Sequence, residues 1–245
     1  MEIFHVHTYR CGHAEDVPDE EYVKKAIELG ASDIWFTDHA PFPGDPFGSR
    51  MKYSQLEEYL STLSSLKQKY SDINIHIGLE TEFFPHFNRA GYYDLLRSYE
   101  EIELLILGQH MAETSDLPPR YSFSESHEYL KENEYKLLGG AIVQGIKSGL
   151  FYAVAHPDRI FRRCNTWNDD MKAVSMQIIQ AATDADIPLE MNLSSVEYPG
   201  AYRKEFWDLV PETAERITGF DAHSLNEMES RQHRMDELLN CFYDV

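Results

Sequence analysis

The sequence predicts an α/β fold in which parallel strands alternate with helices around one sheet or barrel. Short apolar segments alternate with longer segments in which apolar residues recur every three or four positions, as in strands and amphipathic helices. Strand–helix–strand units of this kind build parallel sheets. The length of 245 residues fits one large domain, and no linker divides the chain. We therefore expect residues 1–245 to form a single domain.

Seven segments have the length and apolar content of strands. In the first of them, side chains that alternate between faces would place Ile3, His5 and His7 on one face and Phe4 and Val6 on the other. The fourth is apolar at every position, which is typical of a buried parallel strand. The predicted strands are 3–8, 34–37, 73–83, 104–107, 151–155, 187–193 and 219–222.

Helical periodicity predicts six helices, at 19–29, 56–70, 92–99, 129–148, 171–185 and 227–242. Gly139 and Gly140 predict a break in the fourth of these helices. The segment 41–48 is rich in proline and glycine and is a candidate lid or substrate loop, and 111–124 is predicted to be irregular. Pro199 and Pro211 break helical continuity, so the pattern does not settle the segment 198–217.

The charge and the cysteines exclude several classes of protein. A formal net charge of −20 argues against a nucleic-acid-binding surface, because Lys and Arg must supply the contacts to phosphates. It argues equally against binding to an anionic membrane. Cys11, Cys164 and Cys241 are too few and too widely spaced for a disulfide framework or a thiolate zinc site. Without a signal peptide or an apolar run of about 20 residues, we expect a cytoplasmic location.

Side chains that can bind metals follow the predicted strands where each strand ends. Because these ends open onto one face of a parallel barrel, we expect the side chains to converge there. A single histidine of this kind is more often an ordinary core or surface residue. Imidazoles and carboxylates packed together would, however, cost free energy that divalent cations offset. The side chains are His5, His7, His13, Asp38, His39, Glu80, His110, His156, Asp158, Asn192, Asp221 and His223.

The types of ligand narrow the choice of metal. Imidazole and carboxylate groups without a thiolate suit zinc, iron or manganese better than calcium or magnesium. The sequence does not choose among these three metals. Asp38 and Asp158, each close to a histidine of the set, would either orient imidazole rings or cap the following turns.

These motifs together resemble the PHP (polymerase and histidinol phosphatase) family. They occur in the order of that family and span nearly the whole chain. The resemblance implies a distorted (β/α)7 TIM-like barrel with a centre of three divalent metal ions. The matching segments are 5–7, 13, 37–41, 78–80, 108–110, 155–158 and 221–224.

The resemblance also implies which residues hold each ion. His5, His7, Glu80 and Asp221 would hold the first ion. Glu80, His110 and His156 would hold the second, so that Glu80 bridges the two. The third ion would lie between His13, His39 and His223. All nine positions carry an acceptable ligand in this sequence.

Within the family, the chain resembles the histidinol-phosphate phosphatase branch. This implies hydrolysis of a small phosphomonoester, first of all histidinol phosphate, by a metal-bound hydroxide, with Glu80, Asp221 and His223 as candidate catalytic residues. The branch usually has a Gly-Leu-Arg-type stretch after the asparagine of strand six, whereas residues 192–197 read NLSSVE here. The candidate phosphate contacts are therefore other arginines, each of which could also be an ordinary surface residue: Arg159, Arg162, Arg163 and Arg203.

Three other functions remain open at this stage. The first is a PHP-type phosphodiesterase or nuclease that acts on nucleotides; the net charge counts against a polymeric substrate but not against mononucleotides. The second is a phosphatase for another small phosphate ester. The third is a metal-binding module without catalysis, which the complete set of ligands argues against. The sequence makes no prediction about the oligomeric state.

Overall fold

The computed structural model describes residues 1–114, 119–122 and 128–243. Seven strands lie side by side in chain order, and each is parallel to its neighbours. Part of the predicted loop 111–124 lies outside the described residues. The strands are β1 (Glu2–Val6), β2 (Asp33–His39), β3 (Asn74–Thr81), β4 (Leu104–Leu107), β5 (Ala153–Val154), β6 (Leu189–Asn192) and β7 (Arg216–Gly219).

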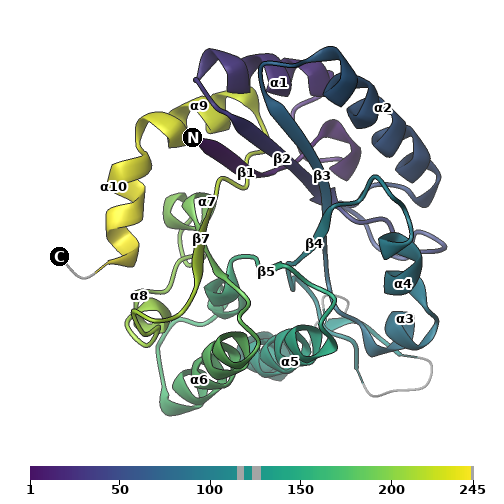
Figure 1. Ribbon diagram of the computed structural model, residues 1–245. Coiled ribbons are helices and arrows are strands. Elements are labelled where there is room, and N and C mark those ends of the chain that lie inside the picture. Colours follow the sequence, from purple (N-terminus) through teal and green to yellow (C-terminus); the bar gives the residue numbers. More distant parts are fainter. Residues whose placement is uncertain (115–118, 123–127, 244–245) are drawn as a thin grey trace.

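The last strand returns to the first, which closes the sheet into a barrel. Phe220 N donates to Phe4 O at 2.8 Å, and His7 N donates to Ala222 O at 2.9 Å. Val6 and Ala222 form a parallel bridge. Figure 1 shows the strands as a ring with the helices outside it. The predicted α/β, TIM-like barrel is therefore confirmed.

The helices cover the outer face of the ring and share one large apolar core with the strands. In α2, for example, Tyr59, Leu60 and Leu63 are buried in that core. The helices are α1 (Asp19–Glu28), α2 (Leu56–Lys69), α3 (Pro85–Arg89), α4 (Tyr92–Arg97), α5 (Glu128–Ser148), α6 (Asp169–Asp184), α7 (Leu193–Glu197), α8 (Lys204–Trp207), α9 (Leu225–His233) and α10 (Met235–Leu239), with short 3-10 turns η1 (Tyr9–Cys11), η2 (Tyr53–Gln55), η4 (Pro157–Phe161) and η5 (Asn240–Phe242).

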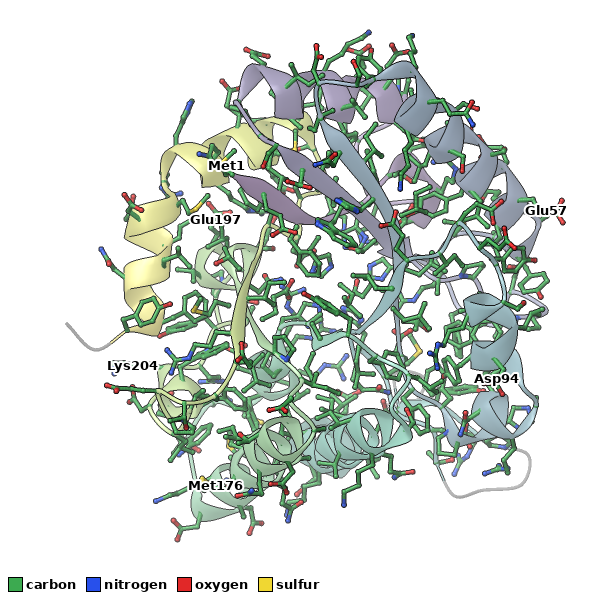
Figure 2. The ribbon with its side chains drawn as sticks, in the orientation of Figure 1. Met1, Glu57, Asp94, Met176, Glu197 and Lys204 are labelled. Carbon is green, nitrogen blue, oxygen red and sulfur yellow. The ribbon has the colours of Figure 1, made fainter. Side chains whose placement is uncertain are left out.

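A second, smaller apolar cluster consists of strand residues and their immediate neighbours. It contains Phe4, Leu104, Ile106, Ala153 and Ala155. These residues alternate along their strands with residues of the large core, so they point into the barrel. Side chains fill the centre of the ring in Figure 2. The barrel interior is thus a packed core, as it is in other α/β barrels.

Strand β1 does not alternate as predicted. Ile3 and Val6 both pack in the outer core, whereas Phe4 belongs to the inner cluster. The pairing register with β2 shifts between Ile3 and Val6, and His5 has a positive φ of 70°. An extra residue of this kind bends a strand and turns its side chains to the other face. The predicted shared face of Ile3 and His5 is therefore wrong.

Most predicted elements differ from the observed ones by one or a few residues at their ends, and three differ further. Helix α5 is not broken at Gly139, because this glycine lies against α6, where a Cβ would come within 2.3 Å of Val174 Cγ1. Strand β7 ends at Gly219, where the predicted strand began. The predicted C-terminal helix is divided at Arg234 into α9 and α10. Among the described residues, none of the helices is both long and apolar enough to span a bilayer.

Candidate functional site

All nine predicted ligands lie together at one end of the barrel. Each sits at the end of a strand or just after it. Glu80 lies within β3, and its carboxylate is a close neighbour of five of the histidines. The distances from its two oxygens are 2.8 Å to His156 Nε2, 3.0 Å to His39 Nδ1, 3.4 Å to His5 Nε2, 3.5 Å to His7 Nε2 and 3.8 Å to His110 Nε2.

A glycine makes room for this carboxylate. A Cβ on Gly108, which follows β4, would lie 1.7 Å from Glu80 Oε1. A side chain at position 108 would force the Glu80 carboxylate to move away. Gly108, two residues before His110, therefore allows Glu80 to reach the centre of the site.

Donor atoms of His5, His7 and Glu80 lie within 4.8 Å of one another, and so form one possible metal-binding group. Asp221 Oδ1 lies 3.3 Å from His7 Nε2 and 3.9 Å from His5 Nε2, which brings the fourth predicted ligand to the same place. Both of these Nε2 atoms are buried, and neither has a hydrogen-bond partner among the described residues.

Two further groups complete the cluster. His13, His39 and His223 form one, and His39, Glu80 and His110 form the other. His156, predicted to share an ion with His110, has its ring centroid 4.9 Å from that of His110. The structure thus brings together the members of all three predicted ligand sets, with His39 lying between two of them.

Burial and neighbouring charges set the protonation of these groups. Burial lowers the pKa of His223 to about 2, with a contribution from His7, and it places the pKa of His39 well below its usual value. Both imidazoles are therefore neutral, which is the form that binds metals. Burial opposes ionisation of Glu80, yet the surrounding imidazoles hold its pKa well below the usual value.

The donor set fits divalent cations. The neutral His39 and His223, the ionised Glu80 and buried ring nitrogens without partners would be costly to hold together in a protein interior. Bound cations would supply the missing partners. Three residues of the cluster also have left-handed backbones, His5 (φ 70°), His156 (φ 32°) and Asp221 (φ 50°), which cost about 1–3 kcal/mol each and are typical of functional sites.

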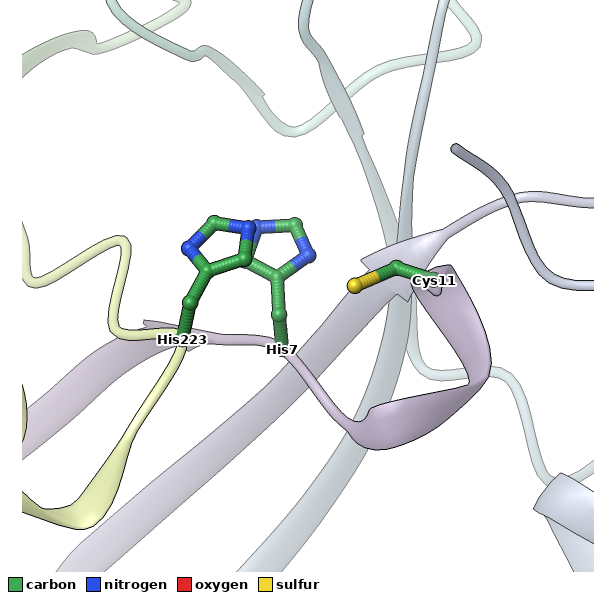
Figure 3. A group of neighbouring side chains, drawn as sticks. All are labelled: His7, Cys11 and His223. Carbon is green, nitrogen blue, oxygen red and sulfur yellow. The ribbon is translucent and has the colours of Figure 1, made fainter. Parts of the chain in front are cut away.

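Cys11 also approaches the cluster. Its Sγ and donor atoms of His7 and His223 lie within 4.8 Å of one another. Figure 3 shows the thiol beside the two stacked rings. Burial raises the pKa of Cys11 to about 12 in the absence of a metal ion, and Cys11 belongs to none of the three ligand sets that the family resemblance implies. We therefore interpret Cys11 as a packing residue.

The four predicted arginines have separate surroundings. Arg159 Nη2 donates to Asp221 Oδ2 at 2.7 Å and to Asn192 Oδ1 at 2.9 Å. Arg162 borders the same cavities as Arg159. Arg163 instead pairs with Glu134 at 3.1 Å, and Arg203 donates to backbone carbonyls of the 161–164 segment. The structure brings only Arg159 and Arg162 to the mouth of the site.

Asp38 and Asp158, the two aspartates close to predicted ligands, also have different surroundings. Asp38 Oδ1 accepts from His39 N at 2.8 Å, so it can cap the backbone at the end of β2. It also lies 3.5 Å from His7 Nδ1, so it can orient the His7 ring. Asp158 accepts from the backbone of Arg203 at 2.8 Å. Its role is therefore to fix a loop.

Two cavities open on the cluster and share His13, Arg159, Arg162, Asp221 and His223. The first, of about 450 Å³, extends towards an apolar wall of Tyr198, Pro199 and Ala201, with Glu227 beside it. The second, of about 390 Å³, extends towards residues 48–50 and Met111. A small ligand can therefore contact the metal-binding groups and an apolar wall at once.

Sequence reasoning missed Arg50 and Glu190, as well as Glu227 beside the first cavity. Arg50 borders the second cavity and pairs with the buried Glu82. It follows the predicted loop 41–48, where no periodic pattern marks it. Glu190 is buried in β6, and its Oε1 lies 2.6 Å from His5 Nδ1. Strand alternation could have found it, since Glu190 shares a face with Asn192.

Comparison with known proteins places this geometry in a family. The PHP domain family model matches residues 4–194, and the chain belongs to that family. It is 29% identical to the probable histidinol-phosphatase of Deinococcus radiodurans, over 93% of this chain and 88% of that protein. It is 34% identical to the histidinol-phosphatase of Bacillus subtilis, over 34% of each chain.

A solved structure shares the fold. The histidinol phosphate phosphatase of Lactococcus lactis, in a complex with Zn, L-histidinol and phosphate, superimposes with a TM-score of 0.73. The match covers 98% of this chain and 93% of that chain at 17% identity. At that identity, the likeness shows the barrel fold and no more.

Proposed function

We propose that this protein is a divalent-metal-dependent phosphomonoesterase that hydrolyses histidinol phosphate to histidinol and phosphate. The observation that carries the proposal is the convergence of the nine predicted ligands at one end of the barrel, where five histidines lie close to the Glu80 carboxylate. The curated relatives, which are histidinol-phosphatases by name, support the choice of substrate. The Lactococcus structure, with zinc, histidinol and phosphate, is consistent with it.

We propose three ions, held by the three ligand sets that the family resemblance implies. Glu80, Asp221 and His223 would then act in catalysis as ligands. Divalent ions supply Lewis acidity, which activates water and neutralises charge on a phosphoryl group. The neutral state of His39 and His223 suits both residues to this role. Zinc, iron and manganese all fit the imidazole and carboxylate ligands.

Arg159 and Arg162 are proposed to orient the phosphate. Arg159 and Arg162 border both cavities, so a phosphate near the cluster would lie within reach of their guanidinium groups. A guanidinium can bind two phosphate oxygens at once. The alcohol part would occupy the larger cavity, where Tyr198 offers an aromatic face and Glu227 a carboxylate for the ammonium group.

A substrate panel tests the proposal. Purified protein is assayed for phosphate release from histidinol phosphate, p-nitrophenyl phosphate and bis-p-nitrophenyl phosphate, after loading with zinc or manganese and after chelation. We expect a kcat/KM for histidinol phosphate well above that for p-nitrophenyl phosphate, and no turnover after chelation. Preference for the diester would favour the phosphodiesterase function. Turnover of no ester by the metal-loaded protein would overturn the proposal.

A further inference from the structure

Glu190 is a buried carboxylate at the site that belongs to none of the three proposed ligand sets. It lies on β6 with no exposed surface. Its Oε1 is 2.6 Å from His5 Nδ1, and its Oε2 accepts from His156 N and from Asn192 Nδ2, each at 2.9 Å. A carboxylate only accepts, so His5 must carry its proton on Nδ1.

We propose that Glu190 is the positioning residue that prepares two metal ligands at once. By holding the proton on His5 Nδ1, it leaves Nε2 free to bind a cation, beside Glu80 Oε2 at 3.4 Å. By accepting from His156 N, it holds that residue in the left-handed backbone that carries His156 Nε2 to Glu80 Oε1 at 2.8 Å. The inference rests on the proposed metal centre.

Two features argue that Glu190 orients ligands and is not itself a ligand. Both of its oxygens already accept from donors, and it belongs to none of the metal-binding groups formed by the described residues. The backbone of the neighbouring strand β7 also leaves room for the Glu190 side chain. A Cβ on Gly219 of β7 would lie 1.8 Å from Glu190 Oε1. Carboxylates that hold a ligand histidine in this way typically change metal affinity 10–100-fold when they are mutated.

Glu190→Gln replaces one of the two accepting carboxylate oxygens of Glu190 with an NH2 group. An amide offers one oxygen and one NH2 group, so it cannot accept from both His5 Nδ1–H and His156 N. Zinc affinity is measured by competition with a chelator, and the His5 Nδ1–H signal by ¹⁵N NMR of the zinc-loaded protein. We expect zinc affinity to fall at least about 10-fold and the Nδ1–H signal to be lost.

Two further variants sharpen the test. Gly219→Ala keeps Glu190 but displaces its carboxylate, and should lower zinc affinity in the same direction even if Glu190→Gln folds poorly. Asp19→Asn, the matched control, removes another buried carboxylate, which pairs with Arg10 outside the site. It should leave zinc affinity and the His5 signal unchanged.

The outcomes separate this inference from the function on which it rests. Wild-type zinc affinity and a retained His5 signal in both Glu190→Gln and Gly219→Ala would overturn the role of Glu190 alone. A wild-type protein that binds no zinc would overturn the proposed centre, and the inference with it. Equal loss of zinc in Asp19→Asn would also overturn it, because general destabilisation would then explain the effect.

Discussion

At the scale of single residues, the site depends on glycines as much as on ligands. Gly108 and Gly219 stand where a Cβ would collide with the carboxylates of Glu80 and Glu190. The proposed ligands could be named from the sequence, because each lies near the end of a predicted strand or in the loop that follows it. The glycines could not, because their role depends on contacts between neighbouring strands that no local pattern encodes.

Gly108→Ala should displace Glu80 without unfolding the protein. The added methyl group would meet the end of a side chain, 1.7 Å from Oε1, and that end can rotate away. We expect a loss of bound metal, with affinity lower by about 10–100-fold or more. Metal content by mass spectrometry and the melting temperature of the metal-free protein are the two measurements. Full metal content in this variant would show that Glu80 is not central.

Cys11→Ala should retain the metal ions. The thiol is buried and neutral, so its loss should cost about 1 kcal/mol of stability through the small cavity left behind. Metal content and turnover are measured beside those of the wild type. Loss of one equivalent of metal would instead make Cys11 a ligand with His7 and His223.

At the scale of elements, the sequence predicted the order of strands and helices but not where the chain bends. Periodicity locates β4 at its observed bounds and α2 within a residue. It fails at His5, where a bulge turns the strand, and at Gly139, which it interprets as a helix break. Both errors have one cause, because the local conformation at each residue depends on a tertiary contact with another element.

Gly139→Ala and Gly140→Ala form a matched pair in α5. At Gly139 the new methyl group would lie 2.3 Å from Val174 Cγ1, whereas nothing lies within 4 Å at Gly140. Overpacking at Gly139 should cost about 1–3 kcal/mol, more than the gain of about 1 kcal/mol in helix propensity. Gly140→Ala should stabilise by about 0.5–1 kcal/mol. Urea unfolding measures both, and equal effects would contradict the proposed packing.

Arg10 joins η1 to α1 and α2 through Asp19 and Glu58, and this contact predicts a pH dependence. The hydrogen bond from Arg10 lowers the pKa of Glu58. A lowered pKa means that the ionised form stabilises the fold above about pH 4.5, and that this contribution is lost as the pH falls through the folded-state pKa.

Glu58→Gln should therefore destabilise the protein at pH 7 by up to about 1 kcal/mol, because Glu58 is half exposed. The difference from the wild type should shrink as the pH falls below about 4.5. Unfolding free energies at several pH values measure it. A difference that grows on acidification would contradict the assigned pair.

At the scale of the whole molecule, closure of the barrel brings residues that are far apart in the sequence together in one site. His7 and His223 are separated by most of the chain, and their rings stack because the chain after β7 returns to β1 through the Val6–Ala222 bridge. The net charge of −20 is consistent with a small substrate that is drawn to a cluster of bound cations. The convergence of the site residues could be predicted from the sequence, since the carboxyl ends of parallel strands lie at the same end of a barrel. The cavity shape could not, because it depends on loop conformation.

Anomalous diffraction from crystals of the zinc-loaded protein tests the central claim most directly. We predict strong peaks within coordination distance of the Glu80 carboxylate, with His5, His7 and Asp221 around one ion and His13, His39 and His223 around another. A saturating zinc concentration that leaves these side chains gathered without any anomalous peak between them would contradict the account.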